Sequence, residues 1–437
     1  MPLLIVAIGI ALLLFLIMYL RVNTFLALIL VALGVGIAIG MTPTAVVQSI
    51  QSGVGGTLGS LALILGLGAM LGALIAESGA AQTITQRLID LFGLKNIQWA
   101  MMLTGFIVGI PLFYTVGFLM VIPIIFAIAK TTKLPLLYVG VPMIASLSVT
   151  HGFLPPHPAP TAIVEFYGAD INLTLIYGLI LAVPTVIIAG PLFAKTLKNI
   201  TTRPPEELYK TKEIPPEQVP SFGVSVLTGL VPVLLMAASA IAKLTLPKES
   251  LALKILEFIG DPVMALFIAV WIAIYTLGIR AGRKLPEIMD SLVDSVKAIA
   301  MIMLIIAGGG ALKQVLIDSG ISNYIVDMMT GVNISPLILA WTIAAALRIA
   351  LGSATVAALT AAGIAVPLVS QMNVNPELLV LATGAGSLTF SQVNDTGFWL
   401  FKEYFNLSIG ETFRSWTAME TIVSIIGLAG CLIMDLF

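Results

Sequence analysis

The sequence predicts an all-helical, polytopic membrane protein built from two inverted repeats, each of five transmembrane helices and one re-entrant hairpin. Three observations predict this fold class. Hydrophobic residues make up 59% of the 437 positions and charged residues only 10%, whereas a soluble domain carries about 25% charged residues. Apolar runs long enough to cross a bilayer recur along the chain. Short motifs of the first half return in the second half in the same order.

Eight apolar runs come close to the roughly 20 residues that a membrane-spanning helix needs. They lie at about 3–20, 24–40, 57–76, 175–194, 222–242, 262–279, 298–317 and 416–436. Each half also has two longer, interrupted segments, a hairpin and a broken helix. These are the hairpin 97–130 and broken helix 135–168, then the hairpin 335–372 and broken helix 376–405. The polar, proline-rich residues 201–220 are predicted to form a cytoplasmic linker between a first repeat at 1–200 and a second at 221–437.

The two halves are related by sequence. Residues 74–79 match 315–320, and residues 145–151 match 386–392, in both cases 241 positions apart. Two further pairs of short matches fall at nearly the same spacing. Four matches in one order, with helix breaks in corresponding places, indicate an internal duplication.

The distribution of basic residues gives the orientation of these elements. Arg87, Lys95 and Lys130 flank the mouth of the first hairpin, which is therefore predicted to open to the cytoplasm, whereas the second opens outward. An odd number of spans in each half inverts the second repeat and places both termini outside. Inverted repeats with broken helices are typical of secondary transporters, because broken helices expose backbone groups that must line a polar cavity.

Composition also excludes several classes of protein. The net charge of −1 gives no basic footprint for a nucleic-acid partner. The single cysteine, Cys431, permits neither a disulfide framework nor a cysteine-based metal site. The two histidines, His151 and His157, are too few for a three-histidine centre, and we predict no cofactor and no metal. The N-terminal apolar run lacks a basic n-region and a cleavage site, so we expect a retained helix rather than a signal peptide.

Polar residues gather at the breaks of the first repeat. The candidate substrate-binding residues there are Tyr114 and Thr115 at the hairpin tip, and Ser148, Thr150, His151 and Gly152 in the broken helix. His151 has three open roles: a proton carrier, a hydrogen-bond partner of an anionic substrate, or a structural histidine bonded to the backbone. His157 lies further along the loop and is a weaker candidate.

The second repeat carries a corresponding set. Its candidates are Arg348, Ser353 and Thr355 at the hairpin tip, and Ser391, Gln392, Asn394, Asp395 and Thr396 in the broken helix. Asp395 is a proton-coupling candidate because it is ionisable and lies in a membrane segment, and it also suits the cap of the next helix. Arg348 needs an anion, which is either the substrate or a structural partner such as Asp395. Small hydroxyl residues at a hairpin tip leave backbone N–H groups free to bind a carboxylate.

The longest of these motifs resemble those of the gluconate:proton symporter family of bacterial sugar-acid permeases. They are residues 147–158 (LSVTHGFLPPHP), 348–357 (RIALGSATVA) and 393–405 (VNDTGFWLFKEYF), and the resemblance runs over essentially the whole chain. It implies a carrier in the bacterial inner membrane for gluconate or a related hydroxy-acid anion, coupled to protons. It also implies a scaffold and a transport subdomain with an elevator-type motion, within a homodimer.

Two positions depart from the family pattern. Many sugar-acid members carry a glutamate where this chain has Thr115 and a histidine where it has Gln392. Both changes remove a titratable group from the predicted site. His151 or Asp395 is therefore expected to take more of the proton coupling, or another cation replaces the proton.

Together these features predict a secondary transporter that imports gluconate or a related sugar-acid anion with a proton. The alternative is a carrier of another small carboxylate, such as D-serine, or one with a different coupling ion. A channel is disfavoured because two opposed dead-end hairpins leave no continuous pore. An intramembrane enzyme needs a nucleophile and a base in reach, for example Ser148 with His151, and we predict that the protein is not an enzyme.

Overall fold

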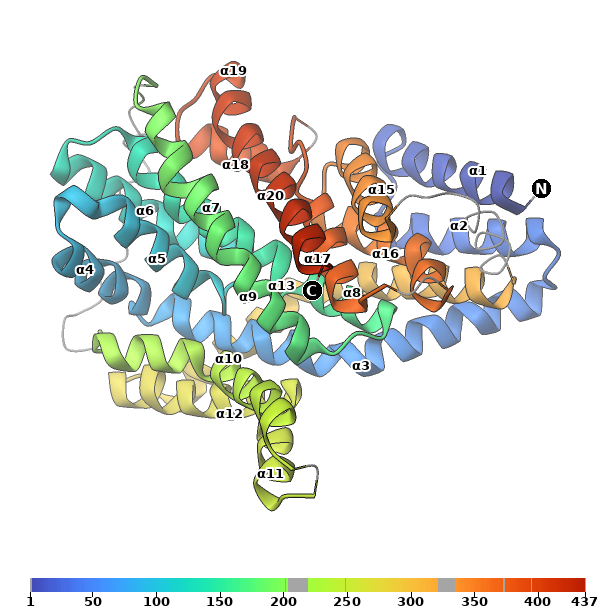
Figure 1. Ribbon diagram of the computed structural model, residues 1–437, viewed down its shortest axis with the longest axis horizontal. Coiled ribbons are helices and arrows are strands. Elements are labelled where there is room, and N and C mark those ends of the chain that lie inside the picture. The colour runs from blue at the N-terminus through green and yellow to red at the C-terminus, as the bar shows by residue number, and fades with distance from the viewer. Residues whose placement is uncertain are drawn as a thin grey trace.

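The computed structural model describes residues 2–200, 202, 219–247, 249–320, 335–371, 374–393 and 395–436. Every regular element in these ranges is a helix, as Figure 1 shows. Seven of the described helices are long and apolar enough to cross a membrane, or up to nine if each bent pair counts as one span. The all-helical, polytopic character is thereby confirmed, whereas five spans in each half stay a prediction. Most of the linker predicted at 201–220 lies outside the described residues.

The first half contains both interrupted elements that the sequence predicts. Its helices are α1 (Pro2–Leu14), α2 (Thr24–Ile39), α3 (Pro43–Glu77), α4 (Ala80–Phe92), α5 (Ile97–Gly109), α6 (Tyr114–Thr132), α7 (Leu136–Phe153), α8 (Pro158–Tyr167) and α9 (Ile171–Ile187). The hairpin corresponds to α5 and α6, and the broken helix to α7 and α8. The amphipathic helix α4 was not predicted, since an apolar-run criterion overlooks a helix with one polar face.

The second half contains the second predicted hairpin, at α15 and α16, and the second broken helix, at α17 and α18. Its helices are α10 (Phe222–Thr245), α11 (Leu251–Ile259), α12 (Pro262–Ala273), α13 (Leu285–Asp318), α15 (Pro336–Leu351), α16 (Ala354–Gln371), α17 (Pro376–Gly386), α18 (Thr396–Tyr404), α19 (Ile409–Thr412) and α20 (Ala418–Met434). A π-helical turn, Phe413–Thr417, joins α19 to α20. The turn of the second hairpin depends on Gly352, whose φ of 75° ends α15 in a left-handed conformation that favours glycine.

Two predicted spans are parts of longer helices. The span at 57–76 lies within α3, which begins at Pro43, and the span at 298–317 lies within α13, which begins at Leu285. Polar and apolar residues are mixed in the stretches of both helices that precede these spans, at 43–56 and 285–297, so hydropathy alone does not detect them. The start of α3 is instead set by its cap, because the Thr42 hydroxyl accepts a hydrogen bond from the N–H of Ala45 (3.3 Å).

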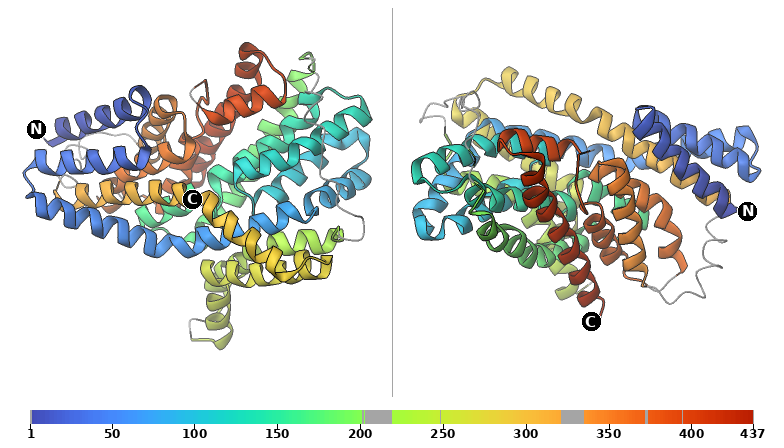
Figure 2. Two further views of the ribbon diagram at one scale, coloured as in Figure 1. Left: turned by 180° about the vertical axis from the view of Figure 1, so that it is seen from behind. Right: turned by 90° about the horizontal axis from the view of Figure 1, so that it is seen from above.

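The long helices α3 and α13 lie side by side (Figures 1 and 2). Small residues bring their backbones together. A Cβ built on Gly53 would lie 2.4 Å from the carbonyl oxygen of Gly310, and one on Gly310 would lie 2.1 Å from the Thr57 hydroxyl. Such close approach is typical of helices packed in membranes. Because α2 also packs on α13, and α12 on α3, this pair is the centre of one group of helices.

A second group consists of α5 to α9 and α15 to α20. Its interior holds the largest buried apolar cluster, which includes the wholly buried Phe126, Phe153 and Phe401. Helices α15 and α16 fold back on each other, and α8 of the first half packs against α16 and α17 of the second. The two halves are therefore joined through the interior of this group, which Figure 1 shows beside the long helix α3.

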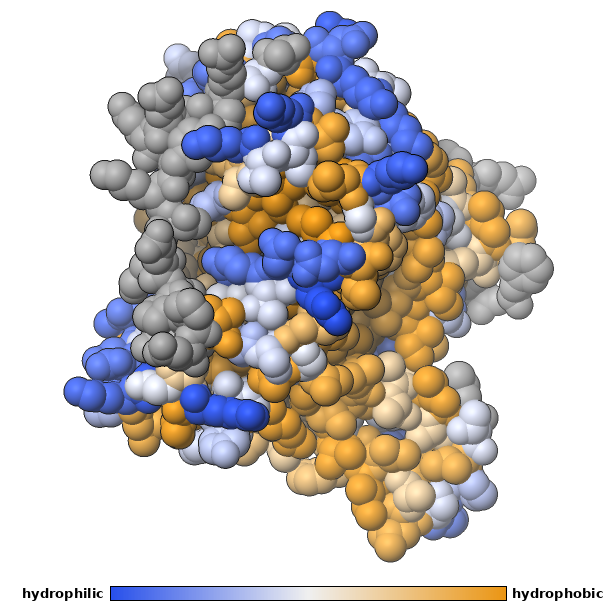
Figure 3. Space-filling view, turned by 90° about the vertical axis from the view of Figure 1, so that its left-hand side faces the viewer, coloured by the Kyte–Doolittle hydropathy of each residue, from blue (hydrophilic) through white to orange (hydrophobic). Residues whose placement is uncertain are grey.

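The basic residues around the mouth of the first hairpin lie near one end of the molecule (Figure 1). Arg87 on α4, Lys95 before α5, and Lys130 and Lys133 at the end of α6 are all exposed. Figure 3 shows this end, where hydrophilic side chains gather beside a broad hydrophobic flank. A charged end next to an apolar flank fits a protein that crosses a bilayer. Which side of the membrane this end faces stays a prediction.

Candidate functional site

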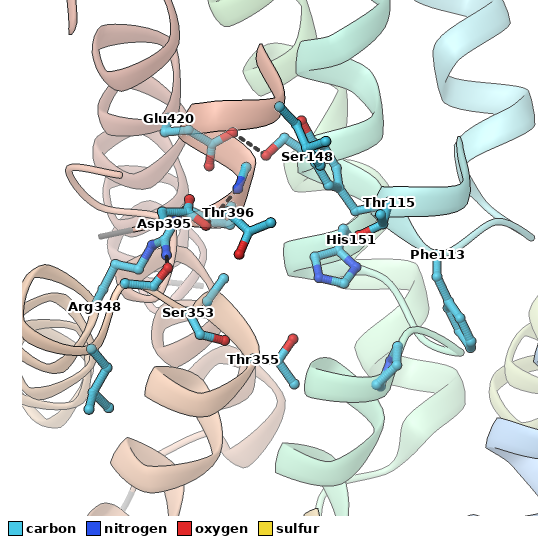
Figure 4. Close-up of a pocket in the computed structure, with 18 of the residues that line it drawn as sticks. Phe113, Thr115, Ser148, His151, Arg348, Ser353, Thr355, Asp395, Thr396 and Glu420 are labelled. Carbon is cyan, nitrogen blue, oxygen red and sulfur yellow. Dashed lines mark hydrogen bonds and ion pairs between the residues drawn. The ribbon is translucent and has the colours of Figure 1, made fainter. Parts of the chain in front are cut away.

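Four interruptions of the helices meet around one cavity of about 370 Å³. They are the α5–α6 turn, the α15–α16 turn, the α7–α8 break and residues 387–395 between α17 and α18. Figure 4 shows side chains from both halves of the chain facing one another across this cavity. Its volume is within the range of about 300–1,000 Å³ that is typical of small-molecule sites.

The cavity brings together most of the residues that the sequence singled out. Those that line it are Tyr114, Thr115, Ser148, His151, Arg348, Ser353, Thr355, Asp395 and Thr396. They come from both hairpin tips and both broken helices, so one site draws on both halves of the chain. Their roles in binding stay predictions.

Four of the named residues do not line the cavity, and Asn394 lies outside the described residues. Thr150 is buried and donates a hydrogen bond to a carbonyl of its own helix (3.0 Å). Gly152 has no room for a side chain, because a Cβ there would lie 2.5 Å from a leucine of the α17–α18 segment. Gln392 Nε2 donates to a carbonyl of α15 (3.1 Å), and Ser391 is bonded to a neighbouring carboxylate. These four residues therefore contact the segments that form the cavity without lining it.

Arg348 and Asp395 form a buried ion pair at the edge of the cavity (Figure 4). The guanidinium of Arg348, which is 3% exposed, donates to the Asp395 carboxylate and to the carbonyl of Gly352. The same carboxylate accepts the Ser391 hydroxyl and the N–H of Gly397 (2.9 Å), and the second bond caps α18. The sequence left the roles of these two residues open. In the structure Arg348 is paired with a structural carboxylate, and Asp395 caps α18. The pair adds no net charge to the cavity.

His151 and His157 form a hydrogen-bonded chain that ends on the first hairpin. His157 Nε2 lies 2.9 Å from the carbonyl oxygen of Gly109, which only accepts, so this nitrogen carries a proton. The Nδ1 atoms of the two rings lie 3.3 Å apart. In neutral His157 the Nδ1 atom is an acceptor, so we assign the donor at this contact to Nδ1 of His151. Nε2 of neutral His151, whose ring lines the cavity, is then left as an acceptor.

Two aromatic side chains form an apolar wall of the cavity. The rings of Tyr114 and Trp416 have centroids 5.8 Å apart, and the Tyr114 ring lies 6.0 Å from that of His151. Trp416 Nε1 donates a hydrogen bond to the hydroxyl oxygen of Ser391 (2.7 Å). The buried hydroxyl of Tyr114 has no hydrogen-bond partner among the described residues. This wall thus combines ring faces suited to a carbon chain with one buried hydroxyl that has no partner among the described residues.

Two helices begin at the cavity. Tyr114 and Thr115, the first residues of α6, line it, and the N-cap residue Phe113 makes no side-chain capping bond. Ser353 and Thr355 line it at the start of α16. The first N–H groups of a helix have no partner within that helix and carry partial positive charge. The geometry therefore suits an anion that also carries hydroxyl groups.

Sequence reasoning missed Glu420, which lines the cavity and is 1% exposed. It lies on the first turn of α20, and the Ser148 hydroxyl of α7 donates to its carboxylate. The signal was present, because an acidic residue inside an apolar span at 416–436 is a functional candidate in its own right. Phe113 and Trp416 were also missed, since an aromatic residue in an apolar segment is no distinctive signal.

Two solved structures have the same general fold. The structure of the Alcanivorax borkumensis YdaH transporter, described as having an unusual topology, matches with a TM-score of 0.63 and covers 94% of this chain and 96% of that one. The structure of Neisseria gonorrhoeae MtrF, described as illuminating a class of antimetabolite efflux pumps, has a TM-score of 0.67 and covers 89% and 84%. Identities of 13% and 16% limit this likeness to the fold.

Comparison of sequences identifies the family. The chain is 60% identical to a high-affinity gluconate transporter and 55% identical to the Gnt-II system L-idonate transporter, both of Escherichia coli, over at least 99% of each chain. It is 51% identical to a Bacillus subtilis gluconate permease over the full length of both. The family described as GntP family permease matches residues 1–437, which confirms the resemblance seen in the motifs. The chain belongs to the GntP family of permeases.

Proposed function

We propose that the protein is a secondary active transporter that imports gluconate or a closely related sugar-acid anion together with a proton. The observation that carries this proposal is the cavity of about 370 Å³ between the starts of α6 and α16, which the hydroxyl groups of Thr115, Ser353 and Thr355 and an aromatic wall line. A sugar acid has a carboxylate at one end and a row of hydroxyl groups along its chain, and each feature has a counterpart here. Relatives named for gluconate and L-idonate support the same substrate class.

The carboxylate of the substrate is proposed to bind at the start of α6. The free N–H groups there and the Thr115 hydroxyl are donors, and the helix dipole favours negative charge. Ser353 and Thr355 then meet the substrate hydroxyls from the opposite hairpin tip. The carbon chain lies on the rings of Tyr114 and Trp416. Because Arg348 is already paired with Asp395, we propose that it orders the site rather than neutralising the substrate.

Coupling to a cation is needed because the inside-negative membrane potential drives an anion outward, by about 2.3 kcal/mol per charge at 100 mV. A proton that travels with a monoanion removes this opposition. His151 and Asp395 were the predicted carriers. We propose that Asp395 is not the carrier, since Arg348 and two further donors already bind its carboxylate. His151 has an acceptor nitrogen for a substrate hydroxyl or for a proton.

The transport step is proposed to be an elevator-type motion of one group of helices against the other. The group with α5 to α9 and α15 to α20 supplies every residue that lines the cavity except Ile302 of α13, and most of the largest buried cluster. Two further clusters lie around α3 and α13. Such a division supports a transport and a scaffold subdomain. A hairpin followed by a broken helix occurs in each half, at α5 to α8 and at α15 to α18, which supports two repeats, and we propose that their orientations are inverted. We further propose a homodimer in the bacterial inner membrane with both termini outside.

The experiment is uptake of labelled gluconate into proteoliposomes with an imposed pH gradient, with and without sodium. For symport of one proton, each unit of pH gradient should raise the accumulation ratio about tenfold. Uptake should saturate, gluconate should emerge chemically unchanged, and L-idonate should compete. No gluconate uptake under either gradient would overturn the substrate assignment, and D-serine would then be the next substrate tested. Uptake that never saturates would favour a channel.

A further inference from the structure

Glu420 is a buried acidic side chain that makes no contact with the substrate in the proposed binding mode. It lies 1% exposed on α20, faces Ser148 of α7 and lines the same cavity as the proposed substrate groups (Figure 4). Its carboxylate has one hydrogen-bond donor in the described structure, the Ser148 hydroxyl. A carboxylate removed from water normally needs several donors or a cation, so this environment is poorly suited to a permanent charge.

The charged groups near Glu420 do not supply a net cation. Arg348 of α15 and Asp395 before α18 both act on it, but they are paired with each other. The remaining ionisable side chains that line the cavity are His151 of α7 and Tyr114 of α6. The Nδ1–H group of neutral His151 is hydrogen-bonded to His157. Among the described residues no basic group forms an ion pair with Glu420, and α9 and α17, which also pack on α20, add no charge to it. The surroundings therefore favour the neutral, protonated carboxyl.

We propose that Glu420 carries the coupled proton. This inference rests on the proposed function and names the group at which its proton binds. From the outside, water delivers a proton to a carboxylate oxygen of Glu420, and the substrate anion then binds in the same cavity. On the inside the anion leaves, and the O–H bond of Glu420 breaks to return the proton to water. The Ser148 hydroxyl donates to the carboxylate whenever that is charged, so the ionised form has one fixed partner.

The variant E420Q separates proton coupling from binding. Glutamine has the volume of glutamate and an amide oxygen that can accept a hydrogen bond from the Ser148 hydroxyl. Its amide does not gain or lose a proton at the pH values of a transport assay. It mimics the protonated carrier. E420Q should therefore exchange internal unlabelled gluconate for external labelled gluconate. Under an imposed pH gradient, however, the internal gluconate concentration should rise no higher than the external one, whereas wild-type protein gains about tenfold per pH unit.

Two further variants complete the test. E377Q is the matched control, because Glu377 is also a buried glutamate, accepts the N–H of Asp170 (2.9 Å) and lies outside the cavity. It should accumulate gluconate as the wild type does. H151Q tests the carrier predicted from the sequence. It should weaken uptake by raising the half-saturating gluconate concentration, and it should keep accumulation driven by the pH gradient.

The outcomes distinguish the two proposals. Wild-type protein that takes up no gluconate would remove the proposed function itself. Accumulation by E420Q at the wild-type ratio would overturn the role of Glu420 and leave gluconate transport standing. If H151Q exchanges gluconate without accumulating it and E420Q accumulates it, His151 is the carrier and the proposal is wrong. Should E420Q not reach the membrane, E420D keeps a titratable group, and exchange without accumulation in E420D would count against the proposal.

Discussion

Removing the negative charge of Asp395 tests whether Arg348 depends on it. Asparagine is as good a helix cap as aspartate, so D395N keeps the bond to the N–H of Gly397 and isolates the effect of charge. It leaves the guanidinium of Arg348, which is 3% exposed, without an anion. Breaking a buried pair in this way costs about 3–5 kcal/mol of unfolding free energy. R348M should cost less, because the orphaned carboxylate keeps the Ser391 hydroxyl and one N–H as donors.

The assay is a double-mutant cycle on detergent-solubilised protein, with unfolding free energies from SDS titration in mixed micelles. R348M/D395N removes both charges, so it should be more stable than D395N alone and should show a coupling energy of about 2 kcal/mol or more. Independent sites add to within about 0.5 kcal/mol. Additive losses in the double variant would therefore refute the reasoning, because they would mean that Arg348 does not rely on Asp395 for its charge. Gluconate exchange by each variant shows whether the site survives.

Three further predictions concern binding, packing and pH. T115V removes a hydroxyl without changing volume, and a bond to a carboxylate worth about 1.5 kcal/mol predicts a roughly tenfold higher KM for gluconate uptake; an unchanged KM would move the carboxylate elsewhere. G53V forces a side chain against Gly310 and should lower the free energy of unfolding by about 1–3 kcal/mol in SDS titration, while the accumulation ratio of folded protein is unaffected. Burial alone would raise the pKa of Asp170, but the Lys243 ammonium at 2.9 Å and the first N–H groups of α9 outweigh it and lower that pKa. The stability that this pair contributes is present at neutral pH and is lost as pH falls through the lowered value, so D170N should be less stable at pH 7 and should lose less on acidification.

The hairpins and broken helices could be predicted because their signals are local. Proline, glycine and hydroxyl residues interrupt apolar runs at the places where the four breaks occur, and Asp395 has the position and chemistry of a helix cap. The part that could not be predicted depends on contacts between distant segments. The sequence left the partner of Arg348 open between the substrate and a structural carboxylate such as Asp395, and only the fold brings Arg348 to Asp395. Glu420 lies 272 positions from Ser148, so its place in the cavity has no local signature beyond an acid in an apolar span.

The charges in the cavity lead to a final prediction about the driving force. Arg348 and Asp395 cancel, so the empty carrier with ionised Glu420 has a cavity charge of −1, and the loaded carrier with a neutral Glu420 and a bound monoanion also has −1. Both crossings of the membrane then move the same charge, and the cycle as a whole is electroneutral. Were Glu420 never protonated, the loaded form would carry one more negative charge. An inside-negative potential would oppose the inward movement of that charge by about 2.3 kcal/mol per 100 mV. Gluconate accumulation in a fixed pH gradient should therefore not change when a potassium diffusion potential is imposed with valinomycin. Accumulation that rises with an inside-negative potential would contradict this balance and would require a second proton, for which His151 is the remaining group in the cavity.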